Sequence, residues 1–264
     1  MEELSHGILL EKNSSTLPMD KIKLLSLIVP AYKQEQTIVE NIRKLEQLLA
    51  TLPYKYEIIV IVDGFLDKTY KRIKKIKKRN IKIFGHKENK GKGYSVKHGM
   101  LKAKGDIVGF IDGGMDINPL AIPLLLDQMS FHDADIVLGS KLHPESKVSY
   151  PISRKILSSG YRTLTRILFG FVVKDTQVGL KFFKRKVVKD VFPRILVKKF
   201  AFDVEVLAVA RARGFTKIYE GPVQLDFSGI SSITSTNFWK VIFSMLWDTA
   251  AIFYRLKILR YYDT

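Results

Sequence analysis

The sequence predicts an α/β fold in which helices flank a mostly parallel sheet, and three observations support that prediction. Short segments rich in Ile and Val alternate with amphipathic helical patterns along the first half of the chain. These apolar segments show no polar alternation, as expected for strands that are covered on both faces. Several of them end abruptly in acidic or glycine-containing turns, at the edge where parallel sheets bind ligands. This order of elements favours right-handed crossovers between neighbouring strands.

The elements of the first half follow one another closely. We expect strands at residues 24–29, 57–62, 81–84, 106–111 and 135–139. We expect helices between them at residues 38–49, 69–79, 91–103 and 119–128. The first helix has an apolar face with helical spacing, formed by Ile38, Ile42, Leu45 and Leu49. The second is strongly basic and has only a thin apolar side.

The second half is dominated by helices. We expect helices at residues 152–170, 186–191 and 201–213, and short strands near residues 179–184 and 216–224. Because no stretch rich in Pro, Gly or Ser separates the halves, we interpret residues 23–228 as one domain. A polar tail, residues 1–22, precedes this domain, and an apolar and aromatic segment, residues 229–264, follows it.

Composition narrows the classes of protein. The 264 residues include no Cys, which excludes disulfides and Cys-based zinc sites. The net charge of +18 predicts anionic partners such as nucleic acid, anionic lipid or phosphorylated substrates. No helix-turn-helix, zinc spacing or RNA-recognition aromatics are present, so we expect no nucleic acid. No secretory signal and no membrane-spanning apolar run are visible, so we expect a cytoplasmic protein that attaches peripherally to the cytoplasmic face of a membrane.

The most informative segment is Ile107–Pro119, in which an apolar strand ends in two carboxylates. Asp112 and Asp116 follow the strand, with Gly113 and Gly114 between them. Oxygen ligands at a strand end suit a hard cation, so we expect Mg²⁺ or Mn²⁺ as cofactor, held by Asp112 and Asp116. The glycines leave space for a ligand to approach the backbone. The alternative is a plain strand followed by a helix cap near Asn118.

Other strands also end in polar residues that would converge on this edge. The second strand ends in Asp63, and the fifth is followed by Lys141. The turn Asn89–Gly93 combines glycines and lysines at a helix start, which predicts an anion site or, alternatively, a solvated basic turn. The spacing is not that of a Walker A motif, and no Gly-x-Gly-x-x-Gly follows the first strand.

These segments together resemble the inverting family 2 glycosyltransferases, and most of all the branch that glycosylates dolichyl or polyprenyl phosphate. The matching segments are Ser26–Glu35, Val62–Thr69, Asn89–Gly93, the Asp112 segment, Asp175–Phe183 and Phe202–Glu205. Asp-Thr-Gln-Val-Gly-Leu-Lys, at residues 175–181, is similar to a stretch of the glucosyltransferases and, less closely, of the mannosyltransferases. The resemblance implies a GT-A-type, Rossmann-like fold, with a nucleotide-sugar half at residues 23–145, an acceptor half at residues 146–228, and C-terminal amphipathic helices.

The resemblance also implies roles for individual residues. Those expected to hold the base and ribose of the nucleotide are Pro30, Tyr32, Glu35, Ile61 and Asp63. Those expected along the diphosphate are Lys92, Asp112, Gly113, Gly114 and Lys141. Those expected to be catalytic, at the cation or facing the transferred sugar and acceptor, are Asp112, Asp175, Gln177 and Asp203.

The expected reaction is transfer of a sugar from a UDP- or GDP-linked donor to a polyprenyl phosphate, with inversion and with help from the divalent cation. Alternatives are a glycosyltransferase with a soluble or polysaccharide acceptor and a non-catalytic nucleotide-sugar-binding module. The second alternative is suggested by Gly114, which stands where the family usually has the second acid of Asp-x-Asp. The departure predicts weaker cation binding or a metal-independent site.

The C-terminal segment Phe238–Tyr262 is expected to be an amphipathic helix. Lys240, Asp248 and Arg255 form a narrow charged stripe on an otherwise apolar and aromatic helix. Such a helix favours contact with an anionic membrane surface. The alternative is docking on the domain itself or on a second subunit in a homodimer.

Overall fold

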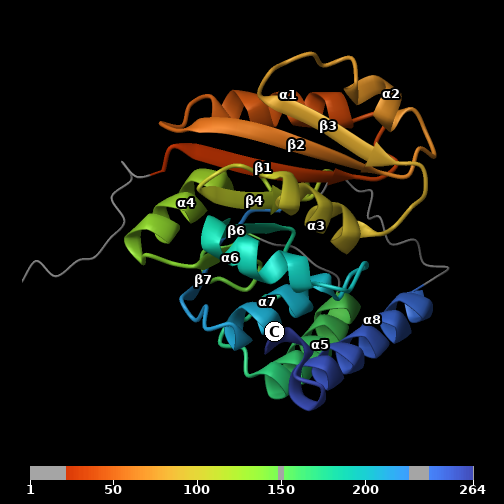
Figure 1. Cartoon of the computed structure of the whole chain (residues 1–264), viewed down its shortest axis with the longest axis vertical. Coiled ribbons are helices and arrows are strands. Elements are labelled where there is room, and N and C mark those ends of the chain that lie inside the picture. The colour runs from red at the N-terminus through yellow and green to blue at the C-terminus, as the bar shows by residue number, and fades with distance from the viewer. Residues whose placement is uncertain (1–21, 148–151, 226–237, 264) are drawn as a thin grey trace, which may run out of the picture.

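A single sheet of seven strands runs through the computed structural model, which describes residues 22–147, 152–225 and 238–263 (Figure 1). The strands are β1 (Leu24–Ala31), β2 (Lys55–Asp63), β3 (Ile81–His86), β4 (Ile107–Ile111), β5 (Ile136–Ser140), β6 (Leu180–Lys184) and β7 (Ile218–Pro222). Their order in the sheet is β3-β2-β1-β4-β6-β5-β7. All pairings are parallel except those of β6 with β4 and β5. The predicted mostly parallel α/β fold is therefore confirmed.

Helices cover the sheet and fill the space below it in Figure 1. They are α1 (Ile38–Leu49), α2 (Thr69–Ile73), α3 (Lys92–Lys102), α4 (Ala121–Phe131), α5 (Ile152–Phe169), α6 (Arg185–Val191), α7 (Phe202–Ala212) and α8 (Phe238–Phe253). A π-helical turn, η4 (Tyr254–Ile258), continues α8, and two short 3-10 turns are η2 (Phe192–Arg194) and η5 (Tyr261–Asp263). No described helix combines the length and apolarity needed to cross a bilayer.

The basic helix is shorter than its pattern predicts. We expected a helix over residues 69–79, but α2 ends at Ile73 and the chain continues to residue 80 as turns and irregular backbone. Only Thr69 and Ile73 of α2 are buried. Like charges at helical spacing destabilise a helix, and the lysines beyond Ile73 bring little apolar surface to offset that repulsion.

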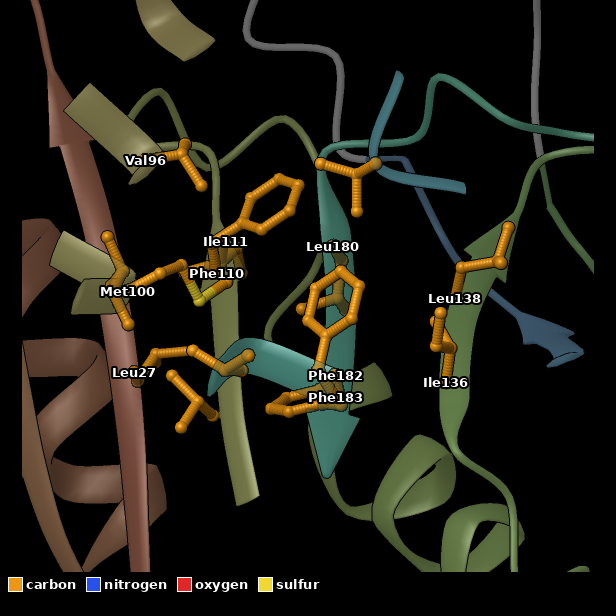
Figure 2. Close-up of a cluster of buried hydrophobic side chains, with 14 of the residues drawn as sticks. Leu27, Val96, Met100, Phe110, Ile111, Ile136, Leu138, Leu180, Phe182 and Phe183 are labelled. Atoms are coloured by element: carbon orange, nitrogen blue, oxygen red, sulfur yellow. The ribbon is translucent and has the colours of Figure 1, made fainter. Parts of the chain in front are cut away.

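Part of the core lies where β1, β4, β6 and β5 meet the helices, and Figure 2 shows a cluster of its buried side chains. Phe110, Phe182 and Phe183 are at most 1% exposed. Gly109 of β4 makes this packing possible, because a Cβ on it would lie 2.3 Å from the Phe182 ring. The tight junction joins β4 to the antiparallel β6 and so fixes the position of both strand ends.

The direction of β6 matters for the site. Because β6 runs against its neighbours, its first residue pairs with the last residue of β4, Leu180 with Ile111. The segment that precedes β6, residues 175–179, therefore arrives at the carboxyl edge of the parallel strands, next to Asp112.

The C-terminal helix packs on the domain. Helix α8 contacts α5 and α7, and η5 contacts α7. Glu205 of α7 accepts hydrogen bonds from the Tyr262 hydroxyl at 2.5 Å and from Arg255 at 3.3 Å. Both Glu205 and Tyr262 are fully buried. This network fastens the end of the chain to α7.

Candidate functional site

Asp112, directly after β4, forms the centre of the site with Lys92, the first residue of α3. The Lys92 ammonium lies 2.7 Å and 2.9 Å from the two carboxylate oxygens of Asp112. Burial alone would lower the pKa of Lys92, but Asp112 and Asp203 outweigh burial and raise that pKa above its usual value. The site therefore presents a permanently charged ammonium beside a carboxylate, at the edge where the parallel strands end.

The turn after Asp112 is held by two amides from the first crossover. Asn41 donates a hydrogen bond to the Gly113 carbonyl at 2.9 Å. The Gln34 amide donates to the same carbonyl at 3.2 Å and accepts from the Gly114 N–H at 2.7 Å. Met115 then adopts a left-handed conformation with a φ of 58°. The glycine pair is thus a fixed turn, and neither amide was recognised in the sequence as part of the site.

Asp116 lies close enough to Asp112 for the two charges to interact. Burial and then the Asp112 carboxylate raise the pKa of Asp116. No group of three or more His, Asp or Glu side chains in the described part of the chain is arranged to hold a metal ion. Two nearby carboxylates still fit a hard cation that completes its shell with water and phosphate oxygens, which is how Mg²⁺ is usually bound.

Gly179 fixes the Asp112 carboxylate from the opposite side. A Cβ on Gly179 would lie 2.1 Å from Asp112 Oδ2. The Gly179 carbonyl also accepts a hydrogen bond from the Asp112 N–H at 2.9 Å. The missing side chain of Gly179 therefore creates the space that Asp112 occupies.

Asp203 forms a buried ion pair with Lys181 behind Lys92. The Lys181 ammonium contacts Asp203 and donates a 2.6 Å hydrogen bond to the Val178 carbonyl. Burial lowers the pKa of Lys181 and raises that of Asp203, and the attraction between the two opposes both shifts. Burial likewise raises the pKa of Tyr161 to about 12, with smaller contributions that include Asp203. The pair joins β6 to α7 under the site.

Asp175 lies beside Lys141, the residue that follows β5. Its carboxylate accepts a 3.0 Å hydrogen bond from the Lys141 N–H and lies 3.7 Å from the Lys141 ammonium. Glu220 of β7 holds the segment by accepting from the Asp175 N–H at 2.8 Å. The hydroxyl of the next residue, Thr176, is buried and forms no hydrogen bond with the described residues. Asp175 also influences Lys181, so this group adjoins the one around Asp203.

Asp63 is turned toward the loop between β3 and α3. Its carboxylate accepts hydrogen bonds from the N–H groups of Lys90 at 2.7 Å and Gly91 at 2.9 Å, and contacts His86 at 2.7 Å. The Tyr94 N–H is occupied as well, by the Lys198 carbonyl. The N–H groups of Lys90, Gly91 and Tyr94, which we expected to bind an anion, are therefore bonded to the protein itself. The group of this turn that remains for binding a ligand is the Lys92 side chain.

The remaining predicted nucleotide contacts lie around the ends of β1 and β2. Tyr32 is 42% exposed, whereas Ile61 is fully buried in the core. The Glu35 carboxylate accepts from the Lys68 N–H at 2.9 Å, and Asp67 accepts from the Glu35 N–H at 3.2 Å. The two loops that follow β1 and β2 are thereby joined.

The structure thus gathers most, but not all, of the predicted residues. Lys92, Asp112, Asp116 and Asp203 form one charged group. Gln177, two residues after Asp175 in the chain, is half-buried. The nucleotide-binding roles inferred for the ends of β1 and β2 stay predictions.

The chain is similar to known proteins over most of its length. Residues 26–192 match the profile of glycosyl transferase family 2. Similar relatives include dolichyl-phosphate beta-glucosyltransferases from Dictyostelium discoideum, 32% identical over 74% of this chain, and from Drosophila melanogaster, 32% identical over 81% of it. The chain spans 64% and 70% of the length of these two relatives.

One further relative matches over nearly its whole length, and a solved structure shares the fold. A UDP-N-acetylglucosamine–dolichyl-phosphate N-acetylglucosaminyltransferase from Methanococcus voltae is 27% identical over 90% of this chain and 96% of its own length. Glucosyl-3-phosphoglycerate synthase from Mycobacterium tuberculosis, solved with Mn²⁺, UDP and glucosyl-3-phosphoglycerate, superposes with a TM-score of 0.65 at 18% identity, covering 88% of this chain and 79% of that one. The second likeness shows a shared fold.

Proposed function

Because the chain belongs to glycosyl transferase family 2, we propose that it transfers a sugar from a nucleoside diphosphate sugar to a polyprenyl phosphate. The observation that supports this most is the Lys92–Asp112 pair at the carboxyl edge of the sheet, with Asp116 and Asp203 beside it. The names of the relatives supply the acceptor class and favour a glucosyl donor, so UDP-glucose is the first donor to test.

The chemistry follows from the charges. An oxygen of the acceptor phosphate attacks the anomeric carbon while the bond from that carbon to the diphosphate breaks, and the electron pair leaves with the nucleoside diphosphate. One displacement inverts the anomeric centre. The Lys92 ammonium is positioned to stabilise the charge that develops on the leaving diphosphate, where such interactions raise rates most. A phosphate is ionised at neutral pH, so the site needs no strong general base.

Asp112 and Asp116 would hold a divalent cation, and that cation would neutralise charge on the diphosphate. Asp175, the buried Thr176 hydroxyl and Gln177 would contact the sugar or the acceptor, and Lys141 would contact a phosphate. We propose that the base and ribose of the nucleotide bind near the ends of β1 and β2, at Pro30, Tyr32, Glu35, Ile61 and Asp63. Asp63 would act indirectly, through the loop between β3 and α3 that its carboxylate holds.

The lipid acceptor requires contact with a membrane, and α8 offers a surface for it. Phe243, Trp247, Tyr254 and Ile258 share one face of α8 and η4, and each is at least 52% exposed. An exposed stripe of this kind on a helix is typical of insertion into the headgroup layer. The net charge of +18 favours anionic lipid. We therefore propose peripheral attachment through α8.

The test is a transfer assay with radiolabelled UDP- and GDP-sugars, a polyprenyl phosphate and Mn²⁺, in which the lipid product is extracted into organic solvent. Asp112→Asn is expected to reduce transfer by roughly 100-fold or more. Asp106→Asn is the matched control at the opposite end of β4, where Asp106 accepts from the N–H groups of Lys23 and Leu24. Near-normal transfer by Asp112→Asn, or no transfer by the unchanged protein with any donor, would contradict the proposal.

A further inference from the structure

A basic groove lies between the segment that precedes α7 and the inner side of α8. It has a volume of about 250 Å³ and is lined by Leu196, Val197, Lys198, Lys199, Ser244, Asp248 and Arg255. Lys198 and Lys199 are exposed. The one acid in the groove, Asp248, faces Lys199 and Arg255, and burial raises its pKa in spite of them. The lining of the groove therefore carries three cations and one acid, beside the apolar side chains of Leu196 and Val197.

Residues 197–202, which include Lys198 and Lys199, pack directly against the turn that carries Lys92. The Lys198 carbonyl accepts a 3.1 Å hydrogen bond from the Tyr94 N–H. A Cβ on Gly91 would lie 2.5 Å from that carbonyl, and a Cβ on Gly93 would lie 2.6 Å from Phe202. The two glycines thus allow the start of α3 to touch residues 197–202. One lining residue of the groove, Lys198, is therefore in direct contact with the turn that carries Lys92.

The other side of the groove continues into the exposed apolar face of α8. Ser244 and Asp248 line the groove, and their neighbours Phe243 and Trp247 on the next strip of the helix are 70% and 76% exposed. Leu196 and Phe200, which flank the two lysines, are each 42% exposed. Positive charge at the inner end and apolar surface at the outer end match a molecule with a phosphate head and a long hydrocarbon chain.

We propose that this groove receives the acceptor lipid, with Lys198 and Lys199 guiding its phosphate toward Lys92 and with the chain lying along α8. The inference rests on the proposed function and adds the route by which the acceptor lipid would reach the site. A nucleic acid fits this region less well, because the exposed side chains next to the groove, Phe200, Phe243 and Trp247, are apolar rather than further cations. The donor diphosphate is already matched by Lys92 at the strand edge.

The experiment compares Lys198→Ser/Lys199→Ser with the unchanged protein in neutral detergent micelles, which remove any general attraction to an anionic membrane. The KM for polyprenyl phosphate is expected to rise about tenfold, whereas kcat and the KM for the donor stay within about twofold. Lys198→Arg/Lys199→Arg keeps the charge and is expected to keep the KM. Lys55→Ser/Lys189→Ser, which removes the same charge from exposed positions at the opposite end of β2 and on α6, is the control.

The outcomes distinguish a failure of the groove proposal from a failure of the proposed function. An unchanged acceptor KM in the Ser variant, with thermal melting like that of the unchanged protein, overturns the groove and leaves the proposed function standing. An equal rise in the Lys55/Lys189 control, or a rise in the donor KM instead, also overturns it. Absence of lipid product from the unchanged protein overturns the proposed function and the groove together.

Discussion

Three glycines surround the Asp112 carboxylate and its turn. Gly113 and Gly114 were recognised in the sequence because they stand between the two acids, whereas Gly179 was noted only as part of a resemblance. Its contact with Asp112 depends on the pairing of β4 with β6, which are separated by almost 70 residues of chain. Local sequence patterns therefore predicted that Asp112 and Asp116 follow the strand. They could not predict that β6 pairs with β4 and brings Gly179 against Asp112.

Gly179→Ala is expected to lower kcat by roughly 100-fold, because the added methyl group would displace the Asp112 carboxylate. The free energy of unfolding should fall by about 1–3 kcal/mol, as for other overpacked positions. Gly160→Ala in α5 is the control, since a Cβ there meets nothing within 4 Å. It should be neutral in transfer and more stable by about 1 kcal/mol. Steady-state kinetics and urea unfolding measure both, and full activity of Gly179→Ala would refute the positioning role.

Gly114→Asp is expected to strengthen cation binding. A Cβ on Gly114 would lie 3.6 Å from the Gln34 amide and 3.8 Å from Asp116 Oδ1, which are ordinary contacts, and the backbone there is not left-handed. A third carboxylate should lower the Mn²⁺ concentration that gives half-maximal transfer by about tenfold. Gly113→Asp is the contrast, because its Cβ would lie 2.6 Å from the Pro30 carbonyl and should disrupt the turn. A Mn²⁺ titration unchanged by Gly114→Asp would contradict a cation held within reach of position 114.

Among the elements, those with buried strands and clear periodicity were predicted within a few residues, and α2 was not. The pattern of Ile and Val placed β1, β2 and β4 because burial on both faces leaves little choice of residue. Helix α2 was predicted too long because an apolar residue at every third or fourth position was counted without the repulsion among the lysines between them. The antiparallel direction of β6 could not be read from its sequence, since a five-residue apolar strand looks the same in either direction.

Tyr262→Phe tests how η5 and α8 are held. Removing the hydroxyl deprives the buried Glu205 of a 2.5 Å hydrogen bond, and we expect a loss of about 1–3 kcal/mol in the free energy of unfolding at pH 8. Tyr254→Phe, at a hydroxyl that is part of a 52% exposed side chain, is the control and should change little.

The loss caused by Tyr262→Phe should depend on pH. Burial raises the pKa of Glu205 above 4.5, and the Tyr262 hydroxyl partly opposes that rise by stabilising the charged form. Without the hydroxyl, the folded-state pKa rises further, so the variant loses additional stability only as pH climbs above the unfolded value. Chemical unfolding at pH 4 and pH 8 should therefore show the larger difference between variant and native protein at pH 8. Equal losses at both pH values would mean that the hydrogen bond does not act on the charge of Glu205.

For the whole molecule, the proposed membrane contact combines positive charge with exposed apolar surface. The charge of +18 is spread over the sequence, whereas the aromatic stripe is confined to α8 and η4. Figure 1 shows α8 at one side of the molecule and α4 at the other. The composition predicted an anionic partner, but only the packing of α8 on α5 and α7 reveals which of its faces remains uncovered.

Flotation with anionic liposomes tests the proposed contact with a membrane. The protein is expected to float at low salt and to float less as salt rises, because lipid attraction to Lys and Arg is screened. Phe243→Ser/Trp247→Ser should reduce binding roughly tenfold or more, given the apolar area removed. Leu120→Ser/Phe131→Ser, which removes side chains that are 65% and 73% exposed at and beside α4, is the control. Equal flotation of both variants, or a change of oligomeric state in sedimentation instead, would assign the stripe to another partner.

The burial of Tyr262 has a practical consequence for work with this chain. The Tyr262 ring is fully buried, and its hydroxyl donates a hydrogen bond to Glu205. Glu205 in turn accepts hydrogen bonds from the N–H groups of Leu196 and Val197, which line the basic groove. A change of sequence beside Tyr262 that displaces its ring would therefore disturb the carboxylate that holds Leu196 and Val197, so a tag is better placed far from Tyr262 in the chain.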